Sequence, residues 1–436
     1  MHEVRGLEAA LAWCALRRAR QASTARRAEL AAAVADVIAT VARRGESALL
    51  DLTRRFDGVE LASVVVPRAR LEADAGELAP ALREAIDLAM ERVRTYYSAQ
   101  AEGGFEIVDS GAKLGMTLRP VASVGCYVPG GTAPLFSSLI MTGVPARVAG
   151  VERVVVATPP RPGGGVPREI AYVALQLGAE SVLSVGGAQA VAALAFGVGE
   201  VRAVDMVVGP GNDYVVEAKR QLFGTVGIDS LAGPTETLVL ADDSADPRHV
   251  AADLVAQAEH VGAEPVLVTT SESLLSQAKR LAHEMAAALP TSGPALESLA
   301  ERGTTVLVAD VSEGVRVLNA FAPEHACLLV RGAEVVAREV RNAGGIFVGH
   351  ASMEALGDYL AGPSHVMPTG GTARFASFVN LRDFQKAIPY VAASRELLER
   401  VGPAAAALAR AEGLEGHARA IEARLLEGPG RSENGG

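Results

Sequence analysis

Cysteine is scarce in this chain, which holds only Cys14, Cys126 and Cys327 among its 436 residues. An odd and widely spaced set provides neither a disulfide framework nor a Cys-x-x-Cys zinc site. We therefore expect reduced thiols and a cytoplasmic location. The chain also lacks an apolar run of about twenty residues, so no membrane span is expected.

Positive charge is in deficit as well, because the formal net charge is −10. A chain of this charge is not expected to bind nucleic acid through a basic surface, although local loops can still hold anions. The apolar fraction of 49% and the charged fraction of 21% are typical of a globular protein. At this length two or more domains are expected.

Short β-branched runs alternate with helical segments through the middle of the chain. This alternation predicts parallel sheets with helices on both faces. We predict an α/β fold with two tandem Rossmann-like parallel-sheet domains and helical N- and C-terminal segments. The expected strands are 121–128, 154–157, 182–185, 204–208, 237–241, 265–269, 304–309, 326–330 and 345–348.

The composition sets the expected boundaries. Residues 1–118 form a helical region that packs on the second α/β domain, 119–232 form the first α/β domain and 233–380 the second. Residues 381–436 return to Ala/Leu/Arg/Glu-rich helix and end in a Gly-rich tail, 428–436, that we expect to be disordered.

The sequence Pro323-Glu324-His325 places an acid beside an imidazole just before an expected strand. Proline restricts the backbone here, so the pair is expected on a turn at the strand edge. A histidine titrates near neutral pH, and a neighbouring carboxylate can tune it or take a second proton. Taken alone, such a pair is more often structural than catalytic.

Three further polar clusters have two interpretations each. Gln257 and His260 are three residues apart at a helix end, where they can bind a metal or His260 can stabilise the helix dipole. In the Gly- and Pro-rich segment 357–365, Asp358 is a ligand or a cap, and His365 contacts a substrate or bonds to the backbone. Glu412 and His417 flank a glycine-interrupted turn that presents them or simply joins two helices.

Three glycine-rich loops follow expected strands: 128–132, 186–189 and 208–212. Each can expose backbone N–H groups to an anion. None is a Gly-x-Gly-x-x-Gly fingerprint, so a dinucleotide site is compatible with the loops but not specified by them.

Taken in order, these motifs resemble the histidinol dehydrogenase family from about Arg119 to His417. The matching blocks are Val124–Gly131, Gly186–Ala190, Gly209–Asn212, Ala232–Glu236, Gln257–His260, Ala322–His325, Gly357–Tyr359 and Pro368–Phe375. A single block would be weak evidence, whereas the ordered set is highly specific. Thr235 stands where serine is common, Ser364 where asparagine is frequent, and segment 377–382 departs from the usual pattern.

The resemblance implies roles for individual residues. Glu324 and His325 handle protons, and Gln257, His260, Asp358 and His417 bind one zinc ion per subunit. The substrate-binding set adds His325 to those ligands, together with Thr235, His365 and Glu412. Tyr127, Gln189 and Asn212 line the NAD site on the 119–232 domain. His417 and Glu412 reach a partner's site in a homodimer that the C-terminal segment holds together.

The implied reaction is the last stage of histidine biosynthesis. L-Histidinol is oxidised to L-histidinal and then to L-histidine, with two NAD reduced in turn. Three alternatives remain open: a zinc- and NAD-dependent dehydrogenase of another small polar alcohol such as a sulfonated diol, a zinc hydrolase, and a non-catalytic metal-binding protein. A hydrolase would need no NAD, and the Glu324–His325 pair favours catalysis over mere binding.

Overall fold

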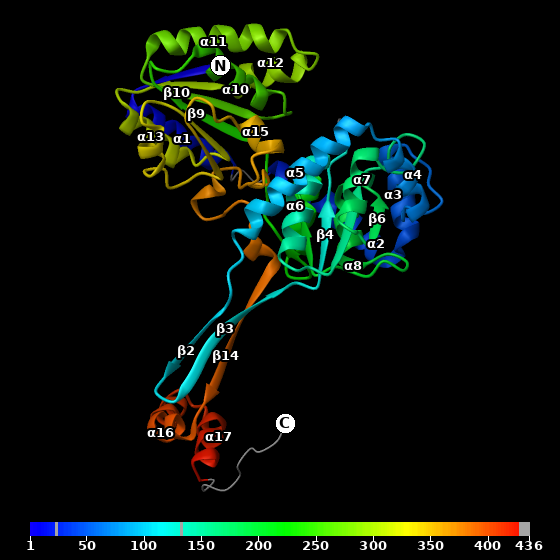
Figure 1. Cartoon of the computed structure of the whole chain (residues 1–436), viewed down its shortest axis with the longest axis vertical. Helices are drawn as coiled ribbons and strands as arrows, with labels where there is room; N and C mark the ends of the chain where they lie inside the picture. The colour runs from blue at the N-terminus through cyan, green and yellow to red at the C-terminus, as the bar shows by residue number, and fades with distance from the viewer. Residues whose placement is uncertain (22–24, 131–133, 427–436) are drawn as a thin grey trace. The chain divides into compact units, whose positions relative to one another are not determined.

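The computed structural model describes residues 1–21, 25–130 and 134–426 and divides into two compact units. The main unit comprises residues 1–100 and 121–384, and the smaller unit comprises residues 101–120 and the chain from 385 onward. Residues 131 and 132 of the predicted loop 128–132 lie outside the described residues, and so does the whole predicted tail 428–436. Figure 1 labels the elements.

The first sheet of the main unit is parallel and follows the order β6-β5-β4-β7-β8. Side chains of β4 alternate between two apolar cores: Val124 and Cys126 face one, and Tyr127 faces the other. Helices therefore cover both faces (Figure 1). The strands are β4 (Ser123–Tyr127), β5 (Arg153–Thr158), β6 (Ser181–Ser184), β7 (Met206–Val208) and β8 (Gly227–Ile228).

The second sheet of the main unit is also parallel, in the order β1-β11-β10-β9-β12-β13. Both sheets thus contain the same doubly wound pattern: counting from β4 in the first sheet and from β9 in the second, the fourth strand returns to the far side of the first. The predicted fold class is confirmed. The strands are β1 (His2–Arg5), β9 (Glu236–Ala241), β10 (Glu264–Thr269), β11 (Thr304–Leu307), β12 (His325–Leu329) and β13 (Gly345–Val348).

The helices begin and end with ordinary signals. Asp246 caps α10 by accepting from the N–H of Arg248 at 2.8 Å, and Pro247 takes the first helical position. Within the described ranges, none of the helices combines the length and apolar character that a membrane span needs. The helices of the main unit are α1 (Leu7–Gln21), α2 (Ala25–Arg44), α3 (Glu46–Asp57), α4 (Arg68–Gly76), α5 (Pro80–Ser98), α6 (Phe136–Val148), α7 (Arg168–Gln176), α8 (Gly187–Phe196), α9 (Asp213–Leu222), α10 (Pro247–Ala258), α11 (Glu272–Ala287), α12 (Ser292–Glu301), α13 (Val311–Phe321), α14 (Ala333–Ala337), α15 (Glu354–Tyr359) and the 3₁₀ turns η1 (Thr372–Arg374) and η2 (Leu381–Phe384).

The N-terminal region differs from the prediction that residues 1–118 form one helical body on the second α/β domain. β1 pairs with β11, and α1 packs on α13, so only this first segment joins the second sheet. Helices α2 to α5 instead pack on α6 to α9 of the first sheet. Their apolar stripes explain the difference: Val34 and Leu49 join one core of that sheet, and Ile86 and Val93 join the other.

The smaller unit contains an antiparallel sheet, in the order β14-β3-β2, that was not predicted. Its strands are β2 (Phe105–Asp109), β3 (Ala112–Pro120) and β14 (Gln385–Ala393), followed by α16 (Arg395–Ala411) and α17 (Glu415–Leu426). Among the described residues of the predicted helical segment 381–436, the α-helices are therefore α16 and α17, which begin only after β14. Pro389 is tolerated because β14 is an edge strand.

Candidate active site

The predicted acid–imidazole pair lies at the amino-terminal edge of the second sheet. His325 begins β12, and its Cα partner in the neighbouring strand β9 is Thr237. Strands β9 and β12 are the two between which the direction of winding reverses. Glu324 and Thr235 come just before these strands, so the parallel register brings two distant segments together.

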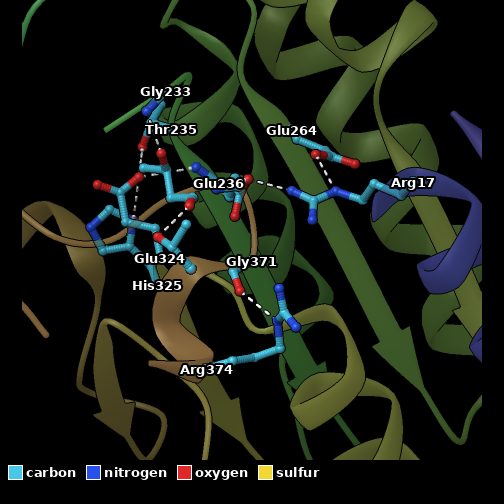
Figure 2. Close-up of polar contacts among 12 residues, drawn as sticks. Arg17, Gly233, Thr235, Glu236, Glu264, Glu324, His325, Gly371 and Arg374 are labelled. Carbon is cyan, nitrogen blue, oxygen red and sulfur yellow. Dashed lines mark hydrogen bonds and ion pairs between the residues drawn. The ribbon is translucent and has the colours of Figure 1, made fainter. Parts of the chain in front are cut away.

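Glu324 is buried and accepts two hydrogen bonds at one carboxylate oxygen. The Thr235 hydroxyl donates to Oε2 at 2.5 Å, and the backbone N–H of Glu236 donates to the same oxygen at 3.1 Å (Figure 2). Burial raises the pKa of Glu324 well above its usual value, against the opposing effect of the Thr235 hydrogen bond. A carboxyl group in this setting suits general acid–base chemistry.

His325 is 4% exposed, and neither ring nitrogen has a hydrogen-bond partner among the described residues. Its Nδ1 lies 3.9 Å from Oε2 of Glu324 and 3.8 Å from Oε2 of Glu354, too far for a hydrogen bond. Burial lowers the pKa of His325 to about 4. The ring is therefore neutral near pH 7 and is free to accept a proton from a bound molecule.

Thr237 links the metal-ligand candidate Gln257 to Glu354, a residue that the sequence reasoning missed. The Thr237 hydroxyl is within hydrogen-bonding contact of both Gln257 Oε1 and Glu354 Oε2. Because a hydroxyl has one proton to donate, one of the two contacts requires a second donor. A protonated Glu354 supplies it, which agrees with the pKa of Glu354 being raised well above its usual value by burial.

Arg17 and Glu236 form a buried ion pair that the sequence reasoning did not predict. Arg17, on α1, pairs with Glu236 and donates through Nε to Glu264 Oε2 at 2.7 Å (Figure 2). Glu236 also accepts from the N–H of Gly370 at 2.7 Å. The Arg17 and Glu236 side chains are 9% and 3% exposed, and the residues are 219 positions apart, so no local pattern could relate them.

The remaining residues predicted near the second sheet are Asp358, His365 and His260, and they surround the Glu324–His325 pair. His365 contacts Asp358 twice: its Nδ1 is 2.9 Å from the Asp358 carbonyl oxygen and 3.9 Å from Oδ1. Asp358, His365 and His260 all act electrostatically on His325. His260 follows the end of α10 and is exposed, whereas Gln257 on its last turn is buried, so the two do not share one face as predicted.

The donor set in the main unit fits a metal ion in chemistry, although it is incomplete. Gln257, His260 and Asp358 offer an amide oxygen, an imidazole and a carboxylate, and the amide oxygen, Oε1 of Gln257, is in hydrogen-bonding contact with the Thr237 hydroxyl. Over the described ranges, the structure gathers no group of three or more His, Cys, Asp or Glu that could hold a metal. The zinc site stays a prediction.

Glu412 and His417 belong to the smaller unit. Glu412 follows the last residue of α16, and His417 lies in the first turn of α17. Gly413 adopts a positive φ of 76° between the helices, as the interrupted pattern suggested. Both side chains are exposed.

The three predicted NAD residues lie at the carboxyl-terminal edge of the first sheet. Tyr127 ends β4, Gln189 lies in the first turn of α8, and Asn212 caps α9 by accepting from the N–H groups of Tyr214 and Val215. The Tyr127 hydroxyl accepts from the N–H of Gly187 at 3.2 Å. Winding reverses between β4 and β7, and nucleotides bind parallel sheets at such a switch point.

Together these features define an α/β protein of two parallel sheets, with a switch point of the kind that binds nucleotides on one sheet and a buried acid–imidazole pair on the other. Comparison with known proteins makes the class specific. The family model for histidinol dehydrogenase matches residues 19–425, and the chain belongs to this family.

Relatives agree over nearly the whole chain. A histidinol dehydrogenase of Deinococcus radiodurans is 54% identical over 89% of this chain and 89% of its own length, and one of Thermus thermophilus is 47% identical over 90% and 93%. The crystal structure of histidinol dehydrogenase from Elizabethkingia anophelis aligns with a TM-score of 0.86 at 33% identity, over 90% of this chain and 91% of that one. The predicted family is confirmed.

Proposed function

We propose that this chain catalyses the zinc-dependent, four-electron oxidation of L-histidinol to L-histidine through L-histidinal, reducing two NAD. Family membership supports the oxidation of histidinol. The observation that carries the mechanism is the buried imidazole of His325, which has no hydrogen-bond partner among the described residues and lies beside the carboxyl group of Glu324.

His325 acts first in the proposed mechanism. Its neutral ring accepts the hydroxyl proton of histidinol while the carbinol C–H bond releases a hydride, and the product is the aldehyde. The lowered pKa keeps the ring unprotonated between turnovers. The proton then leaves to solvent before the second oxidation.

Glu324 acts in the second oxidation. Its carboxylate removes a proton from water as the water oxygen adds to the aldehyde carbon, and His325 accepts the hydroxyl proton of the resulting hydrate as the second hydride departs. Thr235 holds the Glu324 oxygen through a 2.5 Å hydrogen bond. One closed site for both steps protects the reactive aldehyde.

NAD and zinc would supply the remaining chemistry. We propose that Tyr127, Gln189 and Asn212 bind NAD, whose nicotinamide accepts the hydride in each oxidation. Gln257, His260 and Asp358, with His417, would hold zinc, which would orient the amine and imidazole of the substrate. His365 and Glu412 would complete the substrate contacts.

A homodimer with shared sites accounts for the smaller unit. Among its described residues, the buried apolar side chains are only Ala112, Ala406 and Ala418. The exposed fractions of Val108, Val391 and Leu408 are 72%, 70% and 69%. An apolar surface of this kind marks an interface, and a second copy that covers it would bring His417 and Glu412 to its partner's site.

A cytoplasmic location fits the state of the thiols. Cys14, Cys126 and Cys327 are all free and buried in the described structure. Unpaired cysteines are typical of proteins kept in a reducing compartment.

The test is the absorbance of NADH with L-histidinol and NAD, with and without a chelator. Two NADH formed per histidinol, lost on chelation and restored by zinc, is the expected result. NADH formation with a sulfonated diol but not with histidinol would reassign the substrate. No NAD reduction with any alcohol would overturn the proposal and favour a zinc hydrolase.

A further inference from the structure

A buried ion pair forms hydrogen bonds to the backbone of one glycine beside the predicted NAD residues. Lys219 on α9 pairs with Asp229, which follows β8, and their side chains are 2% and 1% exposed. The Lys219 ammonium group donates to the carbonyl oxygen of Gly209 at 3.0 Å. The Asp229 carboxylate accepts from the N–H of the same Gly209 at 2.8 Å.

Gly209 begins the loop that joins β7 to α9, at the switch point of the first sheet. Its φ is +116°, and an added Cβ would lie 2.1 Å from the carbonyl oxygen of Tyr127. Only glycine fits so close to the end of β4. The pair therefore fixes the backbone that lies against Tyr127 and leads to Asn212, two of the predicted NAD residues.

Stability alone does not explain why charged residues occupy this place. Burying an ammonium and a carboxylate costs free energy that their attraction offsets only in part, and an apolar pair of similar volume is often at least as stabilising. What the charged pair adds is two hydrogen bonds to the backbone of one loop residue. A loop held in advance loses less conformational freedom when a ligand binds.

We infer that Lys219 and Asp229 are positioning residues that hold the Gly209–Asn212 loop in the conformation that binds NAD. The inference rests on the proposed function, because it assigns the switch point of the first sheet to NAD. Neither residue needs to touch the dinucleotide, since both act through Gly209.

The experiment compares full-length Lys219→Met and the double variant Lys219→Met/Asp229→Asn with wild type. We expect the KM and the directly measured Kd for NAD to rise about tenfold or more, as when a small displacement spoils a binding geometry. The KM for histidinol should stay within about twofold, because the loop lies on the other sheet. The double variant leaves no unpaired buried charge, so it provides a folded protein if the single variant does not fold.

Asp74→Asn is the matched control. Asp74 is a buried carboxylate on α4, which packs on the helices of the same sheet, and it pairs with Arg161 and Arg70 at 2.9 Å rather than with the Gly209 loop. It should lower the melting temperature without changing the Kd for NAD.

The outcomes separate this inference from the proposed function. If the wild-type protein oxidises histidinol and a folded Lys219 variant has an unchanged Kd for NAD, the positioning role alone is overturned. Weaker NAD binding in a protein that does not oxidise histidinol would support the positioning role and reject the substrate. A wild-type protein that binds no NAD would overturn both.

Discussion

The imidazole of His325 has a different pKa in the folded and unfolded chain, and this difference makes stability depend on pH. Burial lowers the folded pKa to about 4, whereas an unfolded histidine titrates near 6.5. Below pH 6.5 the unfolded chain takes up a proton that the folded chain refuses, so this contribution to stability is lost as pH falls toward 4. Wild type should lose about 2 kcal/mol from this group between pH 7 and 4.5.

His325→Asn should remove that loss. Urea unfolding of the metal-free protein at several pH values measures it, with the exposed His283→Asn variant as control. Glu324 and Glu354 act in the opposite direction, because a raised carboxyl pKa stabilises the folded state at low pH. The comparison of variant with wild type therefore isolates His325, and parallel pH curves for the two would contradict a buried neutral ring.

The proton count at Thr237 predicts how Glu354 responds to substitution. If Glu354 is protonated, the amide of Glu354→Gln can donate to Thr237 in its place, and stability at pH 7 should stay within about 1 kcal/mol of wild type. Glu354→Ala removes the donor and leaves a cavity, so it should cost about 2 to 4 kcal/mol. Chemical denaturation measures both. A Gln variant less stable than the Ala variant would mean that Glu354 carries charge.

Sequence reasoning found those site residues that are neighbours in the chain or belong to a motif. Glu324 and His325 are adjacent, and Gln257 and His260 are close. Arg17 and Glu354 stayed hidden, because each meets its partner only after the second sheet is assembled. A buried charge network over long sequence separation has no period or spacing to reveal it.

Helix α1 is linked to the second sheet by the ion pairs of Arg17 with Glu236 and Glu264. Besides its carboxylate partners, the guanidinium lies 4.1 Å from the centroid of the Phe321 ring on α13. Arg17→Met should destabilise the protein by about 3 to 5 kcal/mol, because Glu236 would be left buried without its cation. Thermal unfolding measures this.

Arg5→Met is the control for Arg17→Met, because Arg5, at the end of β1, pairs with Glu272 on the surface at 2.7 Å. We expect its melting temperature to match wild type, as exposed pairs contribute little. Equal effects of the two substitutions would show that Arg17 does not fasten α1.

The elements predicted correctly are those whose pattern follows from burial. Strands such as β5 and β9 are runs of buried apolar residues between helices. Strand β2 is exposed along its length, and most of β14 is exposed too, so neither is a run of buried apolar residues like β5 and β9. The pairing of β14 with β3 spans more than 260 residues, as at Lys386 and Arg119, so it depends on the rest of the fold.

In the whole molecule, the chain connection explains why one candidate site lies at the carboxyl-terminal edge of the first sheet and the other at the amino-terminal edge of the second. The chain leaves the carboxyl end of β8 and, through residues 229–235, enters the amino end of β9. The edge of one sheet that carries the predicted NAD residues and the edge of the other that carries Glu324 and His325 are therefore joined by one short linker. Asp229 and Thr235, the first and last residues of that linker, each contact the loop or carboxyl group of their own edge.

The proposed sharing of active sites in a homodimer makes a prediction that mixed dimers test. His417→Ala and His325→Asn should each be inactive alone. In a mixed dimer, one site combines an intact His325 with an intact partner His417, so random 1:1 mixing should restore about a quarter of wild-type activity. NADH formation by the mixture measures it, and the doubly tagged dimer isolated after mixing differently tagged subunits should have about half of wild-type activity, because one of its two sites is intact. Mixing His325→Asn with Glu324→Gln is the matched control: both defects lie in the main unit, so every site keeps one and no activity should return. Doubly tagged His417→Ala/His325→Asn dimers without activity would place His417 in the site of its own chain or outside the site altogether.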